Sequence, residues 1–207
     1  MRGRFCRVEP LDPEGHGPDL YAAFTADTEG RNWTYLGYGP FADPASFQSW
    51  LRQTCTGEDP LFHAFVDAGS GRAVGMAAYM RIAPATGSIE IGHINLSPAL
   101  QRKAAATEAM YLMMARVFDE LGYRRYEWKC DSLNAPSRAA AQRLGFQYEG
   151  LFRQALVYKG RNRDTAWYAV TDSDWPLLRD AFQAWLDPGN FASDGGQRRS
   201  LAALRGG

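Results

Sequence analysis

The sequence predicts a single α/β (α+β) domain in which helices flank one sheet of about seven strands. Three observations support this prediction. Alternating residues mark strand-like segments along the chain, apolar residues at helical spacing mark helices between them, and 45% of the 207 residues are hydrophobic. That apolar content suffices for one sizeable core. The predicted order is strand, two helices, three strands, helix, strand, helix, two strands.

Two kinds of local signal locate these elements. Strands are indicated by alternation bounded by glycine-rich turns, such as the stretch Gly69 to Gly71 between two strand-like segments. Helices are indicated by a capping residue before apolar residues at helical spacing, as at Asp43 and Pro44. The expected strands are residues 5–10, 61–68, 72–82, 88–96, 124–130, 146–158 and 165–170, and the expected helices carry Leu20 and Phe24, Phe47 and Leu51, Met110 to Leu121, Asn134 to Gly145, and Leu178 to Leu186.

Residues 1–186 form the expected domain, and residues 187–207 are expected to be a tail. This last segment loses periodicity and gains glycine, so we expect it to be flexible or to take part in an oligomer contact.

The charge balance and the cysteines exclude several classes of protein. Lys plus Arg and Asp plus Glu both number 23, so no overall field would attract nucleic acid or an anionic membrane. The cysteines Cys6, Cys55 and Cys130 form no CxxC pair and indicate neither a disulfide framework nor a metal site. No signal-peptide or membrane-span pattern is found. We therefore expect a cytoplasmic protein without a metal, a nucleic-acid partner or a membrane partner.

The stretch QRKAAATEA, residues 101–109, places small residues where a strand-like segment runs into a helix. The first amide groups of a helix and its positive dipole end can bind phosphate. The alternative is that small residues at a helix start simply pack closely. Ala104, Ala105 and Ala106 suit an amide cradle where the backbone is helical, but not where φ must be positive.

This order of elements, with Leu96-x-Pro98, Gln101-x-x-small-x-small, Asn134-x-x-Ser137 and Leu144-Gly145-Phe146, resembles the GCN5-related N-acetyltransferases (GNAT superfamily). The resemblance is closest to the Rim type, the ribosomal-protein N-terminal acetyltransferases, and spans about residues 5–170. It implies a mixed, mostly antiparallel sheet with a V-shaped splay between the fourth and fifth strands.

The resemblance also implies a binding site for acetyl-CoA in that gap. The backbone of Ile94, Asn95 and Leu96 would pair with the pantetheine arm, and the turn with the start of the helix would hold the pyrophosphate. Asn134 has two compatible roles, as a helix cap and as a pantetheine contact. The residues expected to bind the pyrophosphate are Gln101, Arg102, Lys103, Ala104, Ala105, Ala106 and Thr107.

Acetyl transfer to an amine needs an uncharged nucleophile and a proton for the departing thiolate. Glu90 and His93 are the ionisable candidates to deprotonate the amine, directly or through water; strict alternation puts them on opposite faces of their strand, unless the bulge that the resemblance implies intervenes. Their alternatives are a salt-bridged glutamate and a packed histidine. The tyrosine that many members use as the acid is replaced by Ala141, which leaves Ser137, one helical turn earlier on the same face, as the candidate acid.

The aromatic segment 31–44 is expected to bind the acceptor through Trp33, Tyr35 and Tyr38, with Tyr158 and the turn 159–164 on the other side. A lid packed on the core or a dimer contact is the alternative. The expected function is acetyl transfer from acetyl-CoA to a small amine or a protein N-terminus by direct attack in a ternary complex, with a homodimer as a possible assembly. Alternatives are a succinyl-type donor or a non-catalytic binding module of the same fold.

Overall fold

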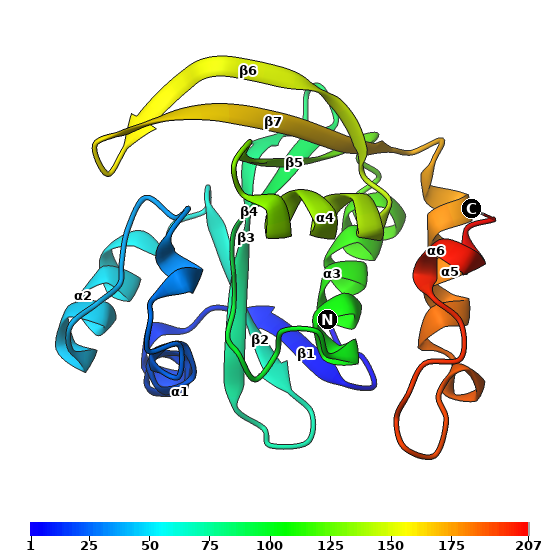
Figure 1. Cartoon of the computed structure of the whole chain (residues 1–207), viewed down its shortest axis with the longest axis horizontal. Coiled ribbons are helices and arrows are strands. Elements are labelled where there is room, and N and C mark those ends of the chain that lie inside the picture. Colours follow the sequence, from blue (N-terminus) through cyan, green and yellow to red (C-terminus); the bar gives the residue numbers. More distant parts are fainter. Residues whose placement is uncertain (207) are drawn as a thin grey trace.

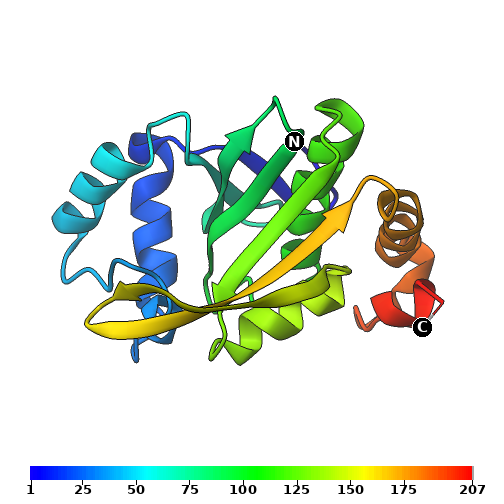
Figure 2. The ribbon, with the colours of Figure 1, turned by 90° about the horizontal axis from the view of Figure 1, so that it is seen from above.

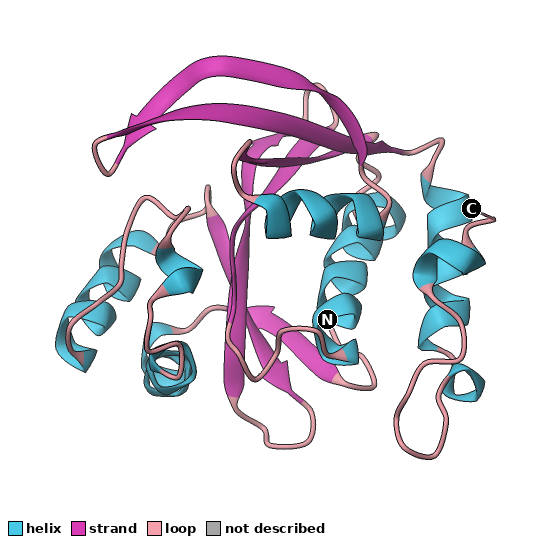
Figure 3. Ribbon diagram, viewed as in Figure 1, coloured by secondary structure: helices cyan, strands magenta, loops and turns pink. Residues whose placement is uncertain are grey.

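The computed structural model describes residues 1–206, in which one seven-stranded sheet separates two groups of helices (Figures 1 and 3). The strand order is β1-β2-β3-β4-β5-β7-β6, and every neighbouring pair is antiparallel except the parallel pair of β4 and β5. The mixed, mostly antiparallel sheet predicted from the sequence is therefore confirmed. The strands are β1 (Cys6–Pro10), β2 (Leu61–Asp67), β3 (Ala73–Ala83), β4 (Ser88–Leu96), β5 (Arg125–Asp131), β6 (Gln147–Tyr158) and β7 (Arg161–Thr171).

The helices begin and end at the residues that their local chemistry favours. Asp43 accepts a hydrogen bond from the Ser46 amide at the start of α2, and Gly145 ends α4 with a φ of 100° that favours glycine. The helices are α1 (Pro13–Thr25), η1 (Arg31–Trp33), α2 (Pro44–Thr54), α3 (Ala104–Ala115), the π-helix η2 (Arg116–Glu120), α4 (Ala135–Leu144), α5 (Trp175–Leu186), η3 (Pro188–Asn190) and α6 (Leu201–Leu204).

Helix α1 begins earlier than the sequence suggested. The turn-like residues 11–18 are helical from Pro13, because Asp12 accepts hydrogen bonds from the Glu14 and Gly15 amides and proline is favourable at the first helical position. Gly17 and Pro18 lie within the helix, where they lower its intrinsic stability, so tertiary packing of Leu20 and Phe24 stabilises it.

The sheet has a separate apolar core on each face. One core joins α3, α4 and α5 to residues such as Ile89, Ile91 and Trp128, and the other joins α1 and α2 to residues such as Phe62 and Ala78. Alternation along each strand supplies both cores from the same segments. Figure 2 shows the β6–β7 hairpin reaching from α4 toward the loop between α1 and α2.

The segment after α5, expected from the sequence to be a tail, packs against the rest of the chain as far as Arg205. Leu201 of α6 is 1% exposed, and the Asn190 amide group donates to the Trp185 and Arg199 carbonyls. The Arg205 guanidinium donates to the Gln142 carbonyl of α4. Because single side chains make these contacts, the segment has no apolar residues at regular spacing that would have predicted its packing from the sequence.

Candidate active site

Strands β4 and β5 are paired over only part of their length. Their register runs from Ser88 opposite Arg125 to Ile91 opposite Trp128, and β4 continues to Leu96 without a partner in β5. We call Ser88–Ile91 the paired half of β4 and Gly92–Leu96 the split half. The gap beside the split half is the V-shaped opening expected from the sequence.

A β-bulge marks the point where the two halves of β4 meet. Ala78 of β3 lies opposite Gly92 and Met76 lies opposite Asn95, so two residues of β4 face one residue of β3. His93 has a φ of 51°, which is uncommon for a residue other than glycine. A Cβ at Gly92 would meet the Met80 sulfur, so a larger residue there would require the flexible Met80 side chain to move.

The bulge brings Glu90 and His93 to the same face of the sheet. Regular alternation would separate residues three apart, but the His93 ring lies 4.9 Å from the ring of Phe62, in the core shared with α1 and α2. Glu90 is on that face as well, since its Oε1 is 3.8 Å from a Cβ built on Gly92, opposite Ala78. Both sequence candidates can therefore face one acceptor.

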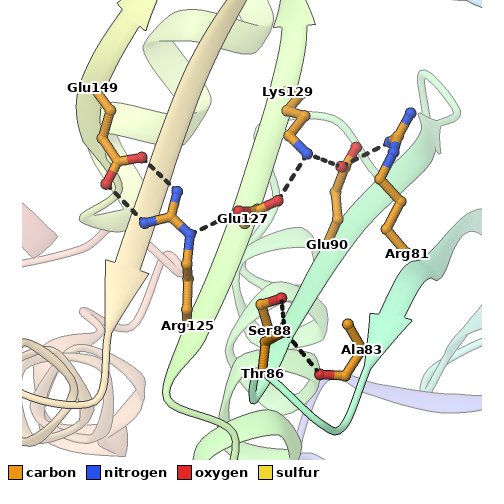
Figure 4. Close-up of polar contacts among 9 residues, drawn as sticks. All are labelled: Arg81, Ala83, Thr86, Ser88, Glu90, Arg125, Glu127, Lys129 and Glu149. Carbon is orange, nitrogen blue, oxygen red and sulfur yellow. Dashed lines mark hydrogen bonds and ion pairs between the residues drawn. The ribbon is translucent and has the colours of Figure 1, made fainter.

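Glu90 is part of a row of alternating charges that crosses the paired half (Figure 4). Its Oε2 accepts from Arg81 and from Lys129, each at 2.8 Å, and Lys129 also contacts Glu127 at 2.7 Å. The Lys129 ammonium lies 3.7 Å from the centroid of the Trp167 ring. The row continues through Arg125 to Glu149. Glu90 is therefore salt-bridged through Oε2, as one of the two interpretations of this residue expected. Its Oε1 has no partner among residues 1–206.

His93 lies in an aromatic environment. The Tyr38 hydroxyl is 3.1 Å from His93 Nδ1, and the two rings stack at 5.6 Å between centroids. Burial, with a smaller contribution from the charge of Arg81, lowers the pKa of His93 below its ordinary value. The imidazole is therefore neutral near pH 7 and able to accept a proton.

The split half of β4 ends in backbone groups that face the gap. The Ser97 amide donates to Val74 of β3, so alternation directs the amides and carbonyls of Ile94 and Leu96 the other way. The Leu96 carbonyl is already bonded, since the side-chain amides of Asn32 and Gln101 donate to it at 3.0 and 2.8 Å. The side chain of Asn95 is 2% exposed and points away from the gap, toward the α1 and α2 side.

The start of α3 presents free amide groups beside that end of β4. Among residues 1–206, the backbone amides of Arg102, Ala104 and Ala105 have no acceptor. The three alanines are helical and the positive φ, 59°, falls on Arg102 instead. Ala105 and Ala106 are 7% and 8% exposed and belong to the core beneath α3, so their methyl groups do not fill the cradle.

Two expected cradle residues use their side chains elsewhere. The Thr107 hydroxyl is buried and accepts from Arg143 at 3.0 Å, and the Gln101 amide group bonds to Asn32 and Leu96. The side chains of Arg102 and Lys103 are exposed. The turn therefore combines free amides with two exposed cations, which is the chemistry of an anion site at a helix N-terminus.

Ser137 lies at the other wall of the gap, in the first turn of α4. Asn134 accepts from the Ser137 amide at 3.2 Å, which confirms its role as a helix cap. The Trp128 indole donates to the Ser137 hydroxyl oxygen at 3.0 Å, which leaves the hydroxyl hydrogen free to be donated. Ala141, where a tyrosine is absent, is fully buried.

The aromatic loop between α1 and α2 contacts residues on both sides of the gap. Tyr35 donates to the Leu133 carbonyl at 2.9 Å, and Tyr38 contacts His93. The turn of the β6–β7 hairpin joins the same loop, because Lys159 donates to the Trp33 and Gly39 carbonyls. Trp33 itself is 4% exposed and forms part of the α1 and α2 core.

Tyr158, on β6 before that turn, contacts β5. Its hydroxyl donates to Asp131 at 2.7 Å, and burial together with this carboxylate raises the pKa of Tyr158 to about 12. The structure thus gathers Tyr35, Tyr38 and Tyr158 around the mouth of the gap, while Trp33 supports the loop from beneath.

Sequence reasoning missed Lys129 and Asn32. Alternation in residues 124–130 puts Lys129 and Trp128 on opposite faces of the strand. Alternation in residues 88–96 applied to Glu90 would have suggested an ion pair between Lys129 and Glu90 across the two strands. Asn32 has no such signal, because its contact with Leu96 joins segments that are 64 residues apart.

Residues 1–206 contain no group of three or more His, Cys, Asp or Glu side chains that could hold a metal ion. Within the same residues, every helix is too short or too polar to cross a bilayer.

A parallel strand pair that separates beside a helix N-terminus with free amides is the arrangement of an acyl-CoA-dependent N-acetyltransferase fold. The acetyltransferase (GNAT) domain family matches residues 7–147. The chain therefore belongs to the GNAT acetyltransferase family, a family of N-acetyltransferase enzymes.

Individual relatives agree with this assignment. A solved structure of a GCN5-related N-acetyltransferase from Brucella melitensis is 50% identical, covers 100% of this chain and 93% of that chain, and has a TM-score of 0.97. The uncharacterized N-acetyltransferase YnaD of Bacillus subtilis is 28% identical over 42% of this chain. YdaF of the same organism, provisionally named a ribosomal N-acetyltransferase, is 26% identical over 53% of it. The chain spans 50% and 61% of the length of these two curated relatives.

Proposed function

We propose that the protein transfers an acetyl group from acetyl-CoA to a primary amine by direct attack in a ternary complex. The observation that carries this proposal is the continuity of the split half of β4 with the three free amides at the start of α3. Acetyl-CoA would supply an activated thioester. The remaining steps depend on groups of this chain.

The donor would be held by the backbone of Ile94 and Leu96 and by the amides of Arg102, Ala104 and Ala105. Ile94 offers both its amide and its carbonyl, which suits the amide groups of a pantetheine chain. Leu96 offers its amide, because Asn32 and Gln101 occupy its carbonyl. The exposed charges of Arg102 and Lys103 would add attraction for a diphosphate.

His93 is the leading candidate to remove the proton from the amine, directly or through a water molecule. For Nε2 to accept that proton, Nδ1 must carry its hydrogen and donate to the Tyr38 oxygen. Glu90 is the second candidate through its free Oε1. Arg81 and Lys129 already contact Oε2, so Oε1 is the oxygen that would contact the amine.

Ser137 would protonate the departing thiolate. Its oxygen accepts the Trp128 indole hydrogen, so its own hydrogen is available, and the indole contact stabilises negative charge on the hydroxyl as the proton leaves. The Asn134 side-chain nitrogen, which lies beside it on the same turn, is available to bond the pantetheine.

An acetyl donor is favoured over a succinyl-type donor by the charges at the paired half. Arg81, Lys129 and Arg125 are each bonded to carboxylates, and the row from Arg81 to Glu149 has as many acidic as basic members. An acyl group that carries a carboxylate would find no surplus cation in this row.

The acceptor would reach His93 and Glu90 beside the aromatic loop, whose Tyr38 contacts His93. The name of YdaF supports a Rim-like acceptor, the N-terminus of a protein, and a small amine is the alternative. A cytoplasmic location is supported by the three cysteines, all free and buried, with burial raising the pKa of the Cys130 thiol.

A homodimer through the edge strand β6 is supported by its exposed apolar side chains. Five of the large hydrophobic residues exposed in residues 1–206 lie on this strand, which has one unpaired edge. They are Tyr148, Leu151, Phe152, Leu156 and Val157.

Calorimetry with CoA and acetyl-CoA, followed by thiol release with a panel of amines and N-terminal peptides, tests the proposal. Micromolar binding and acceptor-dependent thiol release are expected. Millimolar or absent CoA binding would contradict the enzyme function, and tight binding without release for any amine would favour a non-catalytic module.

A further inference from the structure

A cavity lies away from the β4–β5 gap, between α1, α2 and the loop that joins them. Its volume is about 280 Å³, near the lower end of the roughly 300–1,000 Å³ of small-molecule sites. All the residues that line it fall between Tyr21 and Phe47, so none belongs to β4, α3 or β5. The cavity is therefore separate from the proposed donor site.

The walls of this cavity are mostly aromatic. Tyr21, Phe24, Trp33, Phe41 and Phe47 line it. Phe24 and Trp33 meet edge to face at 5.3 Å, and Phe41 meets Trp33 and Phe47 in the same manner at 5.6 and 5.3 Å. These contacts fix the rings in place. Phe24, Trp33 and Phe47 are only 2%, 4% and 1% exposed and form the floor of the cavity. The half-buried rings of Tyr21 and Phe41 present the accessible aromatic surface that can attract a cation.

The polar part of the lining is acidic. Asp27 and Glu29 contribute carboxylates, while Thr25 and Thr28 contribute hydroxyl groups. None of the lining side chains within residues 1–206 is basic. Arg31 and Lys159 are bonded to this loop, Arg31 through Glu29 and Lys159 through the Trp33 and Gly39 carbonyls, but neither lines the cavity.

Asp27 keeps one oxygen for a ligand. Its Oδ2 accepts from the Asn32 amide at 2.8 Å, and its Oδ1 has no partner in the described part of the chain. Glu29, paired with the exposed Arg31, contributes less net charge. The cavity therefore combines an apolar aromatic body with one available negative charge at its rim.

We propose that this cavity binds a small organic cation with an apolar body, such as an alkylammonium or arylammonium ion. The aromatic walls match the apolar body, and Asp27 with the ring faces matches the charge. An anion of the same size would meet the free Oδ1 of Asp27 and no basic lining residue, so it is disfavoured. The site does not depend on the proposed acetyl transfer.

Benzyltrimethylammonium is a suitable probe because it is a permanent cation that cannot be acetylated. Binding to the full chain without CoA is measured by calorimetry, with benzyl alcohol as the neutral comparison. The site is located by fluorine NMR of protein that contains fluorotryptophan, in which the Trp33 signal is assigned with Trp33→Phe. We expect the cation to bind at least about fivefold more tightly than the alcohol and to shift the Trp33 signal.

Two substitutions test the charge at the rim. Asp27→Asn keeps an oxygen for the Asn32 amide but removes the charge, and Thr28→Lys adds a cation at an exposed lining position. Each is expected to weaken cation binding about three- to tenfold and to leave benzyl alcohol unaffected.

Matched controls are Asp43→Asn, which also removes a carboxylate that accepts from a backbone amide, and Thr56→Lys at an exposed position outside the cavity. Both controls should bind as the unchanged protein does. Equal affinity for the cation and the alcohol, no shift of the Trp33 signal, or equal effects of test and control substitutions would each overturn the proposal.

Discussion

The two halves of β4 differ in what their backbone and side chains do. The paired half is bonded to a strand on each side, and its charged side chain, Glu90, is held by Arg81 and Lys129. The split half has a bulge at His93, a free edge toward the gap, and a neutral imidazole. One strand thus contains a part that is paired on both sides and a part that has a free edge toward the gap.

The first prediction tests the rigidity of the paired half. Lys129→Met should lower the free energy of unfolding by about 3–5 kcal/mol, because Glu90 and Glu127 lose a partner that is 8% exposed. Chemical denaturation measures this effect. Arg52→Met, which removes an exposed pair with Glu14, should cost far less, because solvent screens that pair. Equal costs for the two substitutions would show that the row of charges does not stabilise the sheet.

The second prediction concerns the pH dependence of the free energy of unfolding, to which His63, a histidine outside the split half, should contribute. Burial lowers the pKa of His63 on β2 from 6.5 to about 4. Between these pH values the unfolded chain binds a proton that the folded chain does not, so the free energy of unfolding should rise with pH and level off above about 6.5. The full change is at most about 3 kcal/mol.

Denaturation of His63→Gln across that range should show a weaker pH dependence than denaturation of the unchanged protein. The lowered pKa of His93 likewise places any acid limb of kcat/KM that this residue causes below pH 6.5. An acid limb above that value would exclude His93 as the base.

The next prediction concerns the anion site at the end of the split half. Ala104→Glu places a carboxylate at the first position of α3, where it favours the helix but repels a diphosphate. CoA affinity should fall about a hundredfold, or about 3 kcal/mol, with little change in thermal stability. Calorimetry measures the loss, and Ala139→Glu, exposed on α4, is the control. Unchanged CoA affinity in Ala104→Glu would place the pyrophosphate elsewhere.

The smallest expected effect is on the opposite wall of the gap. Ser137→Ala should lower kcat about tenfold without changing CoA affinity, because water can replace the hydroxyl as a proton donor. Single-turnover kinetics across pH measures the change. A full rate at every pH would show that Ser137 is not the acid.

The contrast between the two halves of β4 also shows where sequence reasoning succeeds. Asp43 and Asn134 were identified as caps from short-range patterns, and both cap their helices. The alanines after Lys103 were expected to suit a cradle only with negative φ, and the structure places them inside α3. Each of these conclusions depends on residues within one or two helical turns.

Other features have no short-range signal. Strict alternation separated Glu90 from His93, and the bulge that reunites them depends on the register between β3 and β4. Residues 187–206 lack periodicity, yet Leu201 is buried because it meets α5 and α4, which other parts of the chain supply.

The sequence by itself determined the order of the elements, the helix caps and the small-residue turn, since these follow from local spacing and backbone preference. Only the tertiary structure decided which charges meet across β3, β4, β5 and β6, which face His93 occupies, and that five aromatic rings enclose a cavity. The reason is physical: these properties arise from contacts between segments far apart in the chain, whose energies depend on register and packing and leave no periodic pattern in the sequence.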